Sequence, residues 1–261
     1  MRLAYADQGP GPVVVLLHGF PLSRAMWAEQ LSGIGSIYRV IAPDLRGHGE
    51  SPAPDGVYTM DEMADDVIEL LETLHISEPI VLGGLSLGGY VALSLIVRYP
   101  QRVRGLMLMD TQAGADTAEA AQGREATARA VIEAGSAAPI VDPMIGRLFS
   151  KVTREERPER VEPLRAVMEQ TSARGIAGTL RGMAIRPDRR GDLASISVPT
   201  LVLVGEDDVI TPPAVARSLA EAIPGARLEV ISKAGHMAPY ENHSVANVVI
   251  LRFLNSLEES H

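Results

Sequence analysis

One short segment constrains the fold of this chain more than any other. Residues 79–90 read PIVLGGLSLGGY, which is an apolar run, a Gly-x-Ser-x-Gly pattern centred on Ser86, and the opening of a helix. A serine at such a strand-to-helix turn is forced into a strained backbone conformation that lifts its hydroxyl clear of the sheet edge. Gly84 and Gly88 are required because any side chain there would collide across the tight turn. A glycine-rich turn with a bystander serine gives the same five letters, but the strand before it and the helix after it predict a nucleophilic Ser86.

A second apolar run predicts where negative charge could develop during a reaction. Residues 13–17 read VVVLL and are followed by HGFP at 18–21. A glycine directly after a central strand lets the backbone turn sharply and leaves the next N–H facing the site. We therefore expect the N–H groups of Phe20 and Leu87 to polarise a carbonyl oxygen. We interpret His18 as structural, because an imidazole at a strand end can join two loops through both of its nitrogens.

Two segments near the C-terminus predict a base and an acid. The run TLVLVG at 200–205 is followed by Glu-Asp-Asp, and the strand-like run at 228–231 is followed by a loop containing His236. His236 would take the proton of Ser86 and later return it to the leaving group, while the acid fixes the tautomer of the imidazole. Thr211 is expected to cap the helix that follows the acidic turn.

Three aspartates compete for the role of that acid. Asp207 and Asp208 are adjacent, and Asp110 ends another apolar run. We choose Asp208 and keep Asp110 and Asp207 as alternatives, and we expect one member of the adjacent pair only to solvate its loop. His48, within the segment DLRGHGES at 44–51, is interpreted as a structural turn residue, with a place at the border of the pocket as the alternative.

Four segments together resemble a known family. They are HGFP at 18–21, PDLRGHGES at 43–51, the Ser86 turn, and GEDD at 205–208 with Gly235-His236. In this order they resemble α/β-hydrolase-fold carboxylesterases, close to the 3-oxoadipate enol-lactonases and related small esterases. The resemblance implies a catalytic triad of Ser86, His236 and Asp208, with no metal and no organic cofactor. Relatives often begin with a longer hairpin, whereas only a dozen residues precede Val13, so we expect a short first sheet edge.

The alternation of strands and helices predicts the architecture. It favours an α/β fold with a mostly parallel central sheet that is flanked by helices and joined by right-handed crossovers. The alternation stops at Asp110, and the interval that follows carries helical patterns broken by prolines but no convincing strand. We therefore expect an α/β-hydrolase core formed by residues 1–110 and 191–261. Residues 111–190 are expected to form an inserted helical cap over Ser86.

Composition excludes several other classes of protein. With 261 residues and 46% hydrophobic content, the chain can bury a full core, and no window is apolar enough to span a membrane. The N-terminus lacks the apolar stretch of a signal peptide, so we expect a cytoplasmic protein with no membrane partner. The absence of cysteine rules out disulfides and thiol nucleophiles, and the net charge of −9 argues against nucleic-acid binding. Metallohydrolase and phosphate-loop motifs are also absent from the sequence.

The insertion is more basic than the rest of the chain. Residues 111–190 contain 13 Lys or Arg against 11 Asp or Glu, whereas the remaining residues contain 11 against 22. Cations above the site could attract a carboxylate-bearing substrate, although helical surfaces also interleave arginine with glutamate routinely. Asp116 with Glu119 is expected to cap the first helix of the insertion. The candidates to bind a substrate carboxylate are Arg124, Arg129, Arg147 and Arg181.

These features predict a serine hydrolase that cleaves carboxylic esters of small to medium acyl chain through an acyl-enzyme. The alternative is a lactonase of the 3-oxoadipate enol-lactonase type, acting on a carboxylate-bearing lactone. Outside hydrolysis, the same residues would suit a lyase, a perhydrolase or a ligand receptor that keeps the triad. The expected partner is a small-molecule ester or lactone, and no pattern in the sequence indicates an oligomeric state.

Overall fold

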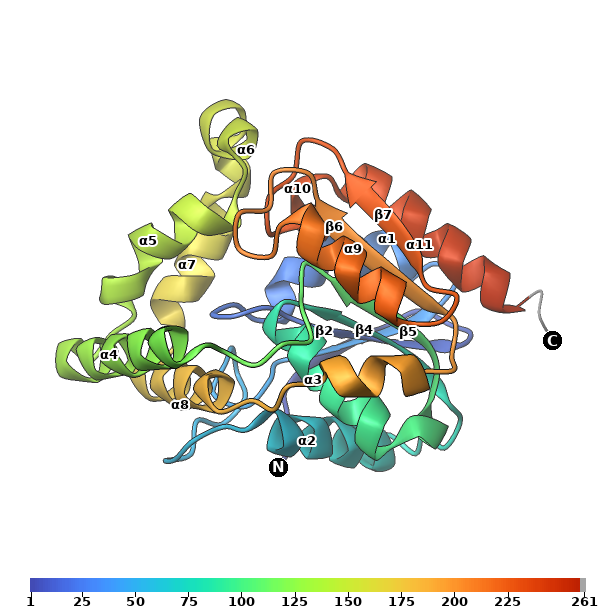
Figure 1. Cartoon of the computed structure of the whole chain (residues 1–261), viewed down its shortest axis with the longest axis horizontal. Helices are drawn as coiled ribbons and strands as arrows, with labels where there is room; N and C mark the ends of the chain where they lie inside the picture. The colour runs from blue at the N-terminus through green and yellow to red at the C-terminus, as the bar shows by residue number, and fades with distance from the viewer. Residues whose placement is uncertain (259–261) are drawn as a thin grey trace.

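The computed structural model describes residues 1–258, in which a seven-stranded sheet lies between two layers of helices (Figure 1). Residues 259–261 of the predicted core segment lie outside the described residues. The strands are β1 (Tyr5–Gln8), β2 (Val13–Leu17), β3 (Arg39–Pro43), β4 (Ile80–Leu85), β5 (Val103–Met109), β6 (Thr200–Gly205) and β7 (Arg227–Ile231). Their order in the sheet is β1-β3-β2-β4-β5-β6-β7, and only the β1–β3 pair is antiparallel. The predicted α/β fold with a mostly parallel sheet is confirmed.

The sequences of the strands match their places in the sheet. Strands β2, β4, β5 and β6 lie in the middle and are almost wholly buried, which suits their unbroken apolar runs. The edge strands β1 and β7 are mostly exposed, and β1 is only four residues long, as the short N-terminal segment predicts. Because β2 and β4 to β7 are parallel, the segments that follow them all emerge at one edge of the sheet.

Helices cover both faces of this sheet. They are α1 (Ala28–Ile34), α2 (Met60–Thr73), α3 (Leu87–Arg98), α9 (Pro213–Ala222), α10 (Ala238–Glu241) and α11 (His243–Glu258). Helices α1 and α11 contact each other on one face, while α2 and α3 contact each other on the other face (Figure 1). The 3-10 helices are η1 (Arg24–Trp27), η2 (Pro100–Arg102), η3 (Pro158–Arg160) and η4 (Arg190–Ser195). None of the helices within residues 1–258 is both long and apolar enough to cross a bilayer.

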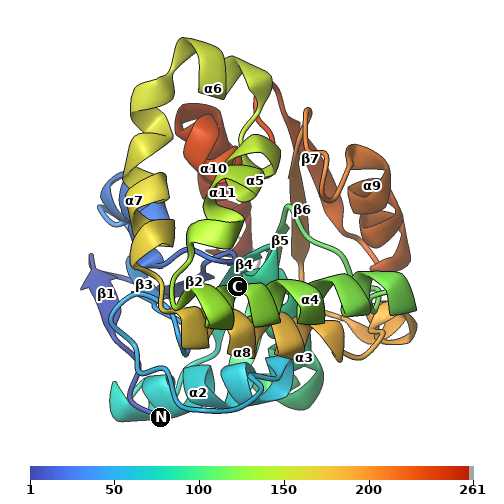
Figure 2. The ribbon, with the colours of Figure 1, turned by 90° about the vertical axis from the view of Figure 1, so that its left-hand side faces the viewer.

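Five α-helices and no strand lie between β5 and β6, as the sequence pattern predicts. They are α4 (Ala118–Ala134), α5 (Ala138–Leu148), α6 (Lys151–Glu156), α7 (Glu162–Gln170) and α8 (Ala173–Ala184). Helices α4 and α8 run side by side (Figure 2). The segment that leaves the sheet after β5 and the segment that returns to it before β6 lie side by side, because the Arg189 N–H donates to the Ala113 carbonyl at 2.8 Å.

The start of α4 differs from the sequence-based expectation. Its N-cap is Thr117, whose hydroxyl accepts from the Ala120 N–H at 3.2 Å. Asp116 was expected to cap this helix, but its carboxylate instead receives hydrogen bonds from Arg124 and Arg186. Aspartate and threonine both suit an N-cap. Because two arginines bind the Asp116 carboxylate, Thr117 caps the helix instead.

Candidate functional site

Ser86 occupies a sharp turn between β4 and α3. Its backbone has φ 53° and ψ −111°, a region that non-glycine residues rarely adopt. A Cβ on Gly84 would lie 2.2 Å from the Gly88 carbonyl oxygen, and a Cβ on Gly88 would lie 2.2 Å from the Leu17 carbonyl oxygen. Backbone atoms cannot move aside as side chains do, so both glycines are required, as the sequence predicts. The Thr111 hydroxyl donates to the Ser86 carbonyl at 2.8 Å and helps to fix this turn.

His236 and Asp208 meet at the same edge of the sheet, after β7 and β6 respectively. His236 Nδ1 lies 2.8 Å from Asp208 Oδ2, and both side chains are buried. The other carboxylate oxygen accepts from the N–H groups of Ile210 and Thr211, at 2.8 and 3.0 Å. Burial by itself raises the pKa of Asp208, but its hydrogen bonds to His236 and Thr211 outweigh burial and hold the pKa below its usual range. A carboxylate on Nδ1 favours the tautomer in which Nε2 is free to accept a proton.

Thr211 has a role that the sequence reasoning missed. Helix α9 begins at Pro213 with Pro212 at the N-cap, so Thr211 does not cap it as expected. Its hydroxyl instead donates to Asp208 Oδ2 at 2.7 Å and lies 3.3 Å from His236 Nδ1. The signal was available, because an aspartate three residues before a threonine is typical of a turn closed by the carboxylate.

The three candidate aspartates have different surroundings. Asp207 is exposed, as expected of the residue that only solvates the loop. Asp110 is buried at φ 45°, and its two oxygens accept from the N–H groups of Gly205 at 2.8 Å and Ala238 at 3.1 Å. Burial, followed by the nearby charge of Asp208, raises its pKa well above the usual range. Of the three, Asp208 is the one hydrogen-bonded to the histidine within residues 1–258.

The backbone amides of Phe20 and Leu87 belong to segments that adjoin Ser86, since a Cβ on Gly19 would lie 3.6 Å from the Ser86 Cβ. Phe20 follows β2 in a turn, and Leu87 is the first residue of α3, where helical N–H groups lack partners. Within residues 1–258, neither amide donates a hydrogen bond to another group. Neither N–H is therefore used by another group in the described part of the chain, and the role of this pair as an oxyanion site stays a prediction.

Two buried histidines lie below the site. His18 joins two loops through both ring nitrogens, with Nδ1 3.0 Å from the Gly19 carbonyl oxygen and Nε2 2.9 Å from the Leu45 nitrogen, which confirms its structural role. Burial lowers its pKa to about 4. His48 lies in a turn but is fully buried, with its ring 5.1 Å from that of His18 and Nδ1 3.0 Å from the Arg46 carbonyl oxygen. Burial, with the neighbouring His18, lowers the pKa of His48 to about 3.

A cavity of about 420 Å³ connects the sheet edge with the helices of the insertion. Its volume falls within the range of small-molecule sites. Residues 1–258 bring together no group of three or more His, Asp or Glu side chains that could hold a metal ion. The lining residues are Phe20, Ser86, Tyr90, Ala120, Gly123, Arg124, Thr127, Ile140, Met144, Arg147, Leu148, Leu180, Met183, Ile210 and His236.

The four candidate arginines separate into two pairs. Arg124 and Arg147 line the cavity. Arg129 and Arg181 do not, because both bind Glu125, with Nε–Oε distances of 3.0 and 2.9 Å. Only the first pair is placed to meet a bound molecule.

Comparisons with known proteins agree with the fold described above. The family described as alpha/beta hydrolase fold matches residues 12–243. A 3-oxoadipate enol-lactonase from Acinetobacter baylyi is 34% identical over 254 residues, which cover 95% of this chain and 92% of that protein.

Solved structures show the same likeness. A thermophilic esterase from Thermogutta terrifontis, determined with malate bound, is 42% identical with a TM-score of 0.96, covering 98% of this chain and 93% of that one. The enol-lactonase from Burkholderia xenovorans LB400 is 31% identical with a TM-score of 0.90, covering 97% and 96%. The resemblance seen in the sequence is thus confirmed, and this chain belongs to the alpha/beta hydrolase fold family as a hydrolase of that fold.

Proposed function

We propose that the chain hydrolyses carboxylic esters of small to medium acyl chain through an acyl-enzyme on Ser86. The observation that carries the proposal is the 2.8 Å contact between His236 Nδ1 and Asp208 Oδ2, made beside a cavity that Ser86 and His236 both line. A serine, a base and an orienting carboxylate are the groups that activate a hydroxyl for attack on a carbonyl carbon.

In the proposed reaction, Ser86 Oγ attacks the ester carbonyl carbon while His236 Nε2 takes the hydroxyl proton. The carbonyl oxygen becomes an oxyanion and accepts hydrogen bonds from the N–H groups of Phe20 and Leu87. The carbon–oxygen ester bond then breaks, and the alcohol leaves with the proton from His236. Water, deprotonated by His236, attacks the acyl-enzyme and releases the acid and free Ser86, while Asp208 stabilises the imidazolium in both halves.

The cavity supports the proposed size of the acyl group. Most of its lining is apolar, and its volume of about 420 Å³ suits a short or medium chain. Residues from α4, α5 and α8 form one wall, so in this proposal residues 111–190 act as a cap on a core formed by 1–110 and 191–261.

A lactone is the second candidate substrate. It is favoured by the similarity to two proteins named as enol-lactonases. The steps at Ser86 would be the same, except that the leaving alcohol stays tethered to the acyl group. A lactonase would hydrolyse a cyclic ester faster than an open-chain ester of similar size, which a paired assay would show.

The proposal is tested by steady-state hydrolysis of p-nitrophenyl acetate, butyrate, octanoate and decanoate. We expect turnover that is highest for the short chains and is abolished in Ser86→Ala, while the far-ultraviolet circular dichroism of this variant stays native. Ser218→Ala, an exposed serine on α9, is the matched control and should keep full activity. Hydrolysis that persists unchanged in Ser86→Ala would contradict the proposed mechanism.

A further inference from the structure

The charge of the cavity is one-sided. Two guanidinium groups line it, Arg124 from α4 and Arg147 from α5, and no Asp or Glu of residues 1–258 does so. The rest of the wall is largely apolar, apart from a few hydroxyl groups and the imidazole of His236. A positive charge facing a mostly apolar cavity is poorly solvated, and an anionic group of a ligand compensates it more strongly than in open water.

Arg124 is held at the cavity wall from behind. Its Nε donates to Asp116 Oδ2, and its Nη2 lies 3.4 Å from Asp116 Oδ1. Its remaining nitrogen, Nη1, lies 3.5 Å from Met183 Sδ, and a thioether is only a weak acceptor. The guanidinium is thus fixed on one side and keeps donor capacity on the other.

Asp116 does not fully neutralise the charge of Arg124, because the same carboxylate also pairs with a second arginine. Arg186 Nη1 donates to Asp116 Oδ1 at 2.6 Å, and the Arg186 and Asp116 side chains are only 3% and 5% exposed. Burial by itself raises the pKa of Asp116, but the two arginines outweigh burial and hold the pKa below its usual range. Two guanidinium groups that share one carboxylate leave a net positive charge.

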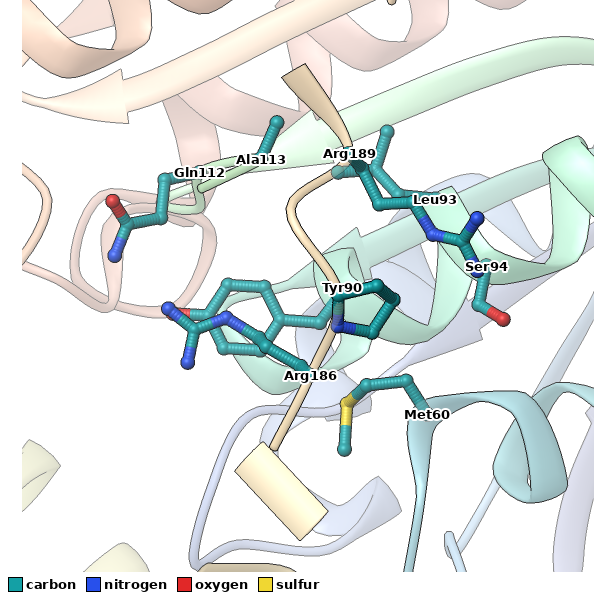
Figure 3. Close-up of a pocket in the computed structure, with 9 residues that line it drawn as sticks. Met60, Tyr90, Leu93, Ser94, Gln112, Ala113, Arg186 and Arg189 are labelled. Carbon is teal, nitrogen blue, oxygen red and sulfur yellow. The ribbon is translucent and has the colours of Figure 1, made fainter. Parts of the chain in front are cut away.

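Arg186 is itself fixed by the core. Its Nε donates to the Gly114 carbonyl at 3.1 Å and its Nη1 to the Met183 carbonyl at 3.0 Å. Its guanidinium lies 4.3 Å from the centre of the Tyr90 ring, and the two side chains can be followed in Figure 3. Tyr90 follows the Ser86 turn in α3 and also lines the cavity. A continuous set of contacts therefore joins the Ser86 helix to the guanidinium of Arg124.

We propose that Arg124, assisted by Arg147, selects substrates that carry a free carboxylate besides the scissile ester or lactone. Asp116 and Arg186 act as positioning residues that hold the Arg124 guanidinium at the wall. The inference rests on the proposed hydrolysis at Ser86, and it names the substrate class of that same site. A planar carboxylate can receive two N–H groups from one guanidinium, and this pairing is strong and directional.

The test compares two substrates of nearly equal shape: the monomethyl ester of glutaric acid, and the same molecule with its carboxylic acid converted to the amide. We expect the native protein to prefer the carboxylate substrate in kcat/KM, as measured by methanol release. Arg124→Met should lower kcat/KM for the carboxylate substrate about 10- to 100-fold, mainly through KM, as loss of a hydrogen bond to a charged group implies. The loss of kcat/KM for the amide substrate should be much smaller.

Two further variants sharpen the test. Arg129→Met removes an exposed arginine of the same helix, which binds Glu125 outside the cavity. This variant should therefore leave kcat/KM unchanged for both substrates. Asp116→Asn should raise KM for the carboxylate substrate more than KM for the amide substrate, whereas a general loss of structure would impair both equally. If Asp116→Asn fails to fold, because it leaves buried Arg186 without its carboxylate, Arg124→Met decides the inference alone.

Equal losses on both substrates in Arg124→Met, or no preference of the native protein for the carboxylate, would overturn the inference while leaving ester hydrolysis intact. Failure to hydrolyse any ester would instead contradict the proposed function. In that event, calorimetric titration of glutarate into Ser86→Ala still decides the inference. We expect binding that is lost when Arg124→Met is added, and absence of binding in Ser86→Ala would overturn it.

Discussion

The edge of the sheet and the helices between β5 and β6 fix their side chains by different means. At the sheet edge, Asp208 accepts two backbone N–H groups, the Thr211 hydroxyl and His236 Nδ1. Helix α4, in contrast, buries only Ala128 and Val131 of its 17 residues, and Arg124 reaches the cavity as a long side chain anchored by an ion pair. Asp208, which is proposed to take part in the reaction, is held mainly by backbone N–H groups. Arg124, which is proposed to select the substrate, is held by an ion pair. One of these residues can therefore change without disturbing the other.

The largest expected effect lies at the sheet edge. Asp208→Asn should lower kcat for p-nitrophenyl butyrate about 10⁴-fold, because an amide in this place favours the wrong tautomer of the histidine. The adjacent, exposed Asp207→Asn is the matched control and should keep native activity. Equal losses in the two variants would show that the loop as a whole, rather than one carboxylate, supports the reaction. A comparable loss in Asp110→Asn alone would assign the acid to Asp110.

A pair of glycine substitutions tests the difference in packing. Gly88→Ala places a Cβ 2.2 Å from the Leu17 carbonyl oxygen, so the free energy of unfolding should fall by about 3 kcal/mol or more. Gly146→Ala lies in helix α5 with no atom within 4 Å of the new Cβ, and it should raise the free energy of unfolding by about 0.5–1 kcal/mol. Urea unfolding of both variants measures the contrast. Similar destabilisation by the two substitutions would contradict the proposed difference between the regions.

The smallest expected effect is a pH dependence of stability that comes from a buried histidine, His18, rather than from the helices between β5 and β6. His18 has a pKa of about 4 in the folded protein, below its value in the unfolded chain, because burial disfavours the charged form. The unfolded state therefore binds more protons between about pH 6.5 and 4, and His18 makes stability fall as pH falls, by about 1.4 kcal/mol per unit. Urea unfolding at pH 7 and pH 5 should show a smaller loss in His18→Asn than in the native protein.

Comparison between variants removes the contribution of every other titrating group. His75→Asn replaces an exposed histidine in a turn at φ 55°, a conformation that asparagine tolerates, and it should leave the loss of stability between pH 7 and pH 5 at the native value. A native pH dependence in His18→Asn would show that the buried imidazole is not its source.

Local patterns were sufficient to predict the sheet edge. A strand, a glycine turn and a helix are encoded within twelve neighbouring residues around Ser86, and parallel strands bring Phe20, Asp208 and His236 to the same edge whatever lies between them. The sequence also indicated that both ring nitrogens of His18 would be engaged, because a polar side chain at a buried strand end needs partners.

Contacts between distant segments account for what the sequence did not predict. Asp116 has the local signature of a helix cap, but its partner Arg186 is 70 residues away, and nothing near either residue indicates the pairing. Four arginines were equal candidates in the sequence, and Glu125 removes two of them from the cavity. Which of several like side chains faces a cavity depends on helix rotation, and surface helices with weak amphipathic patterns specify this rotation poorly.

The two ends of the segment between β5 and β6 lie side by side, which has a consequence for how chains of this fold can differ in length and sequence. Strands β5 and β6 are neighbours in the sheet, paired from Leu106↔Thr200 to Met109↔Leu203, although the segment between them holds five helices. Both ends of that segment meet where the Arg189 N–H reaches the Ala113 carbonyl. A segment whose two ends lie side by side can be lengthened, shortened or replaced without moving the strands that flank it. The sheet edge that carries Ser86, Asp208 and His236 can thus be combined with a different set of helices by exchanging this one segment.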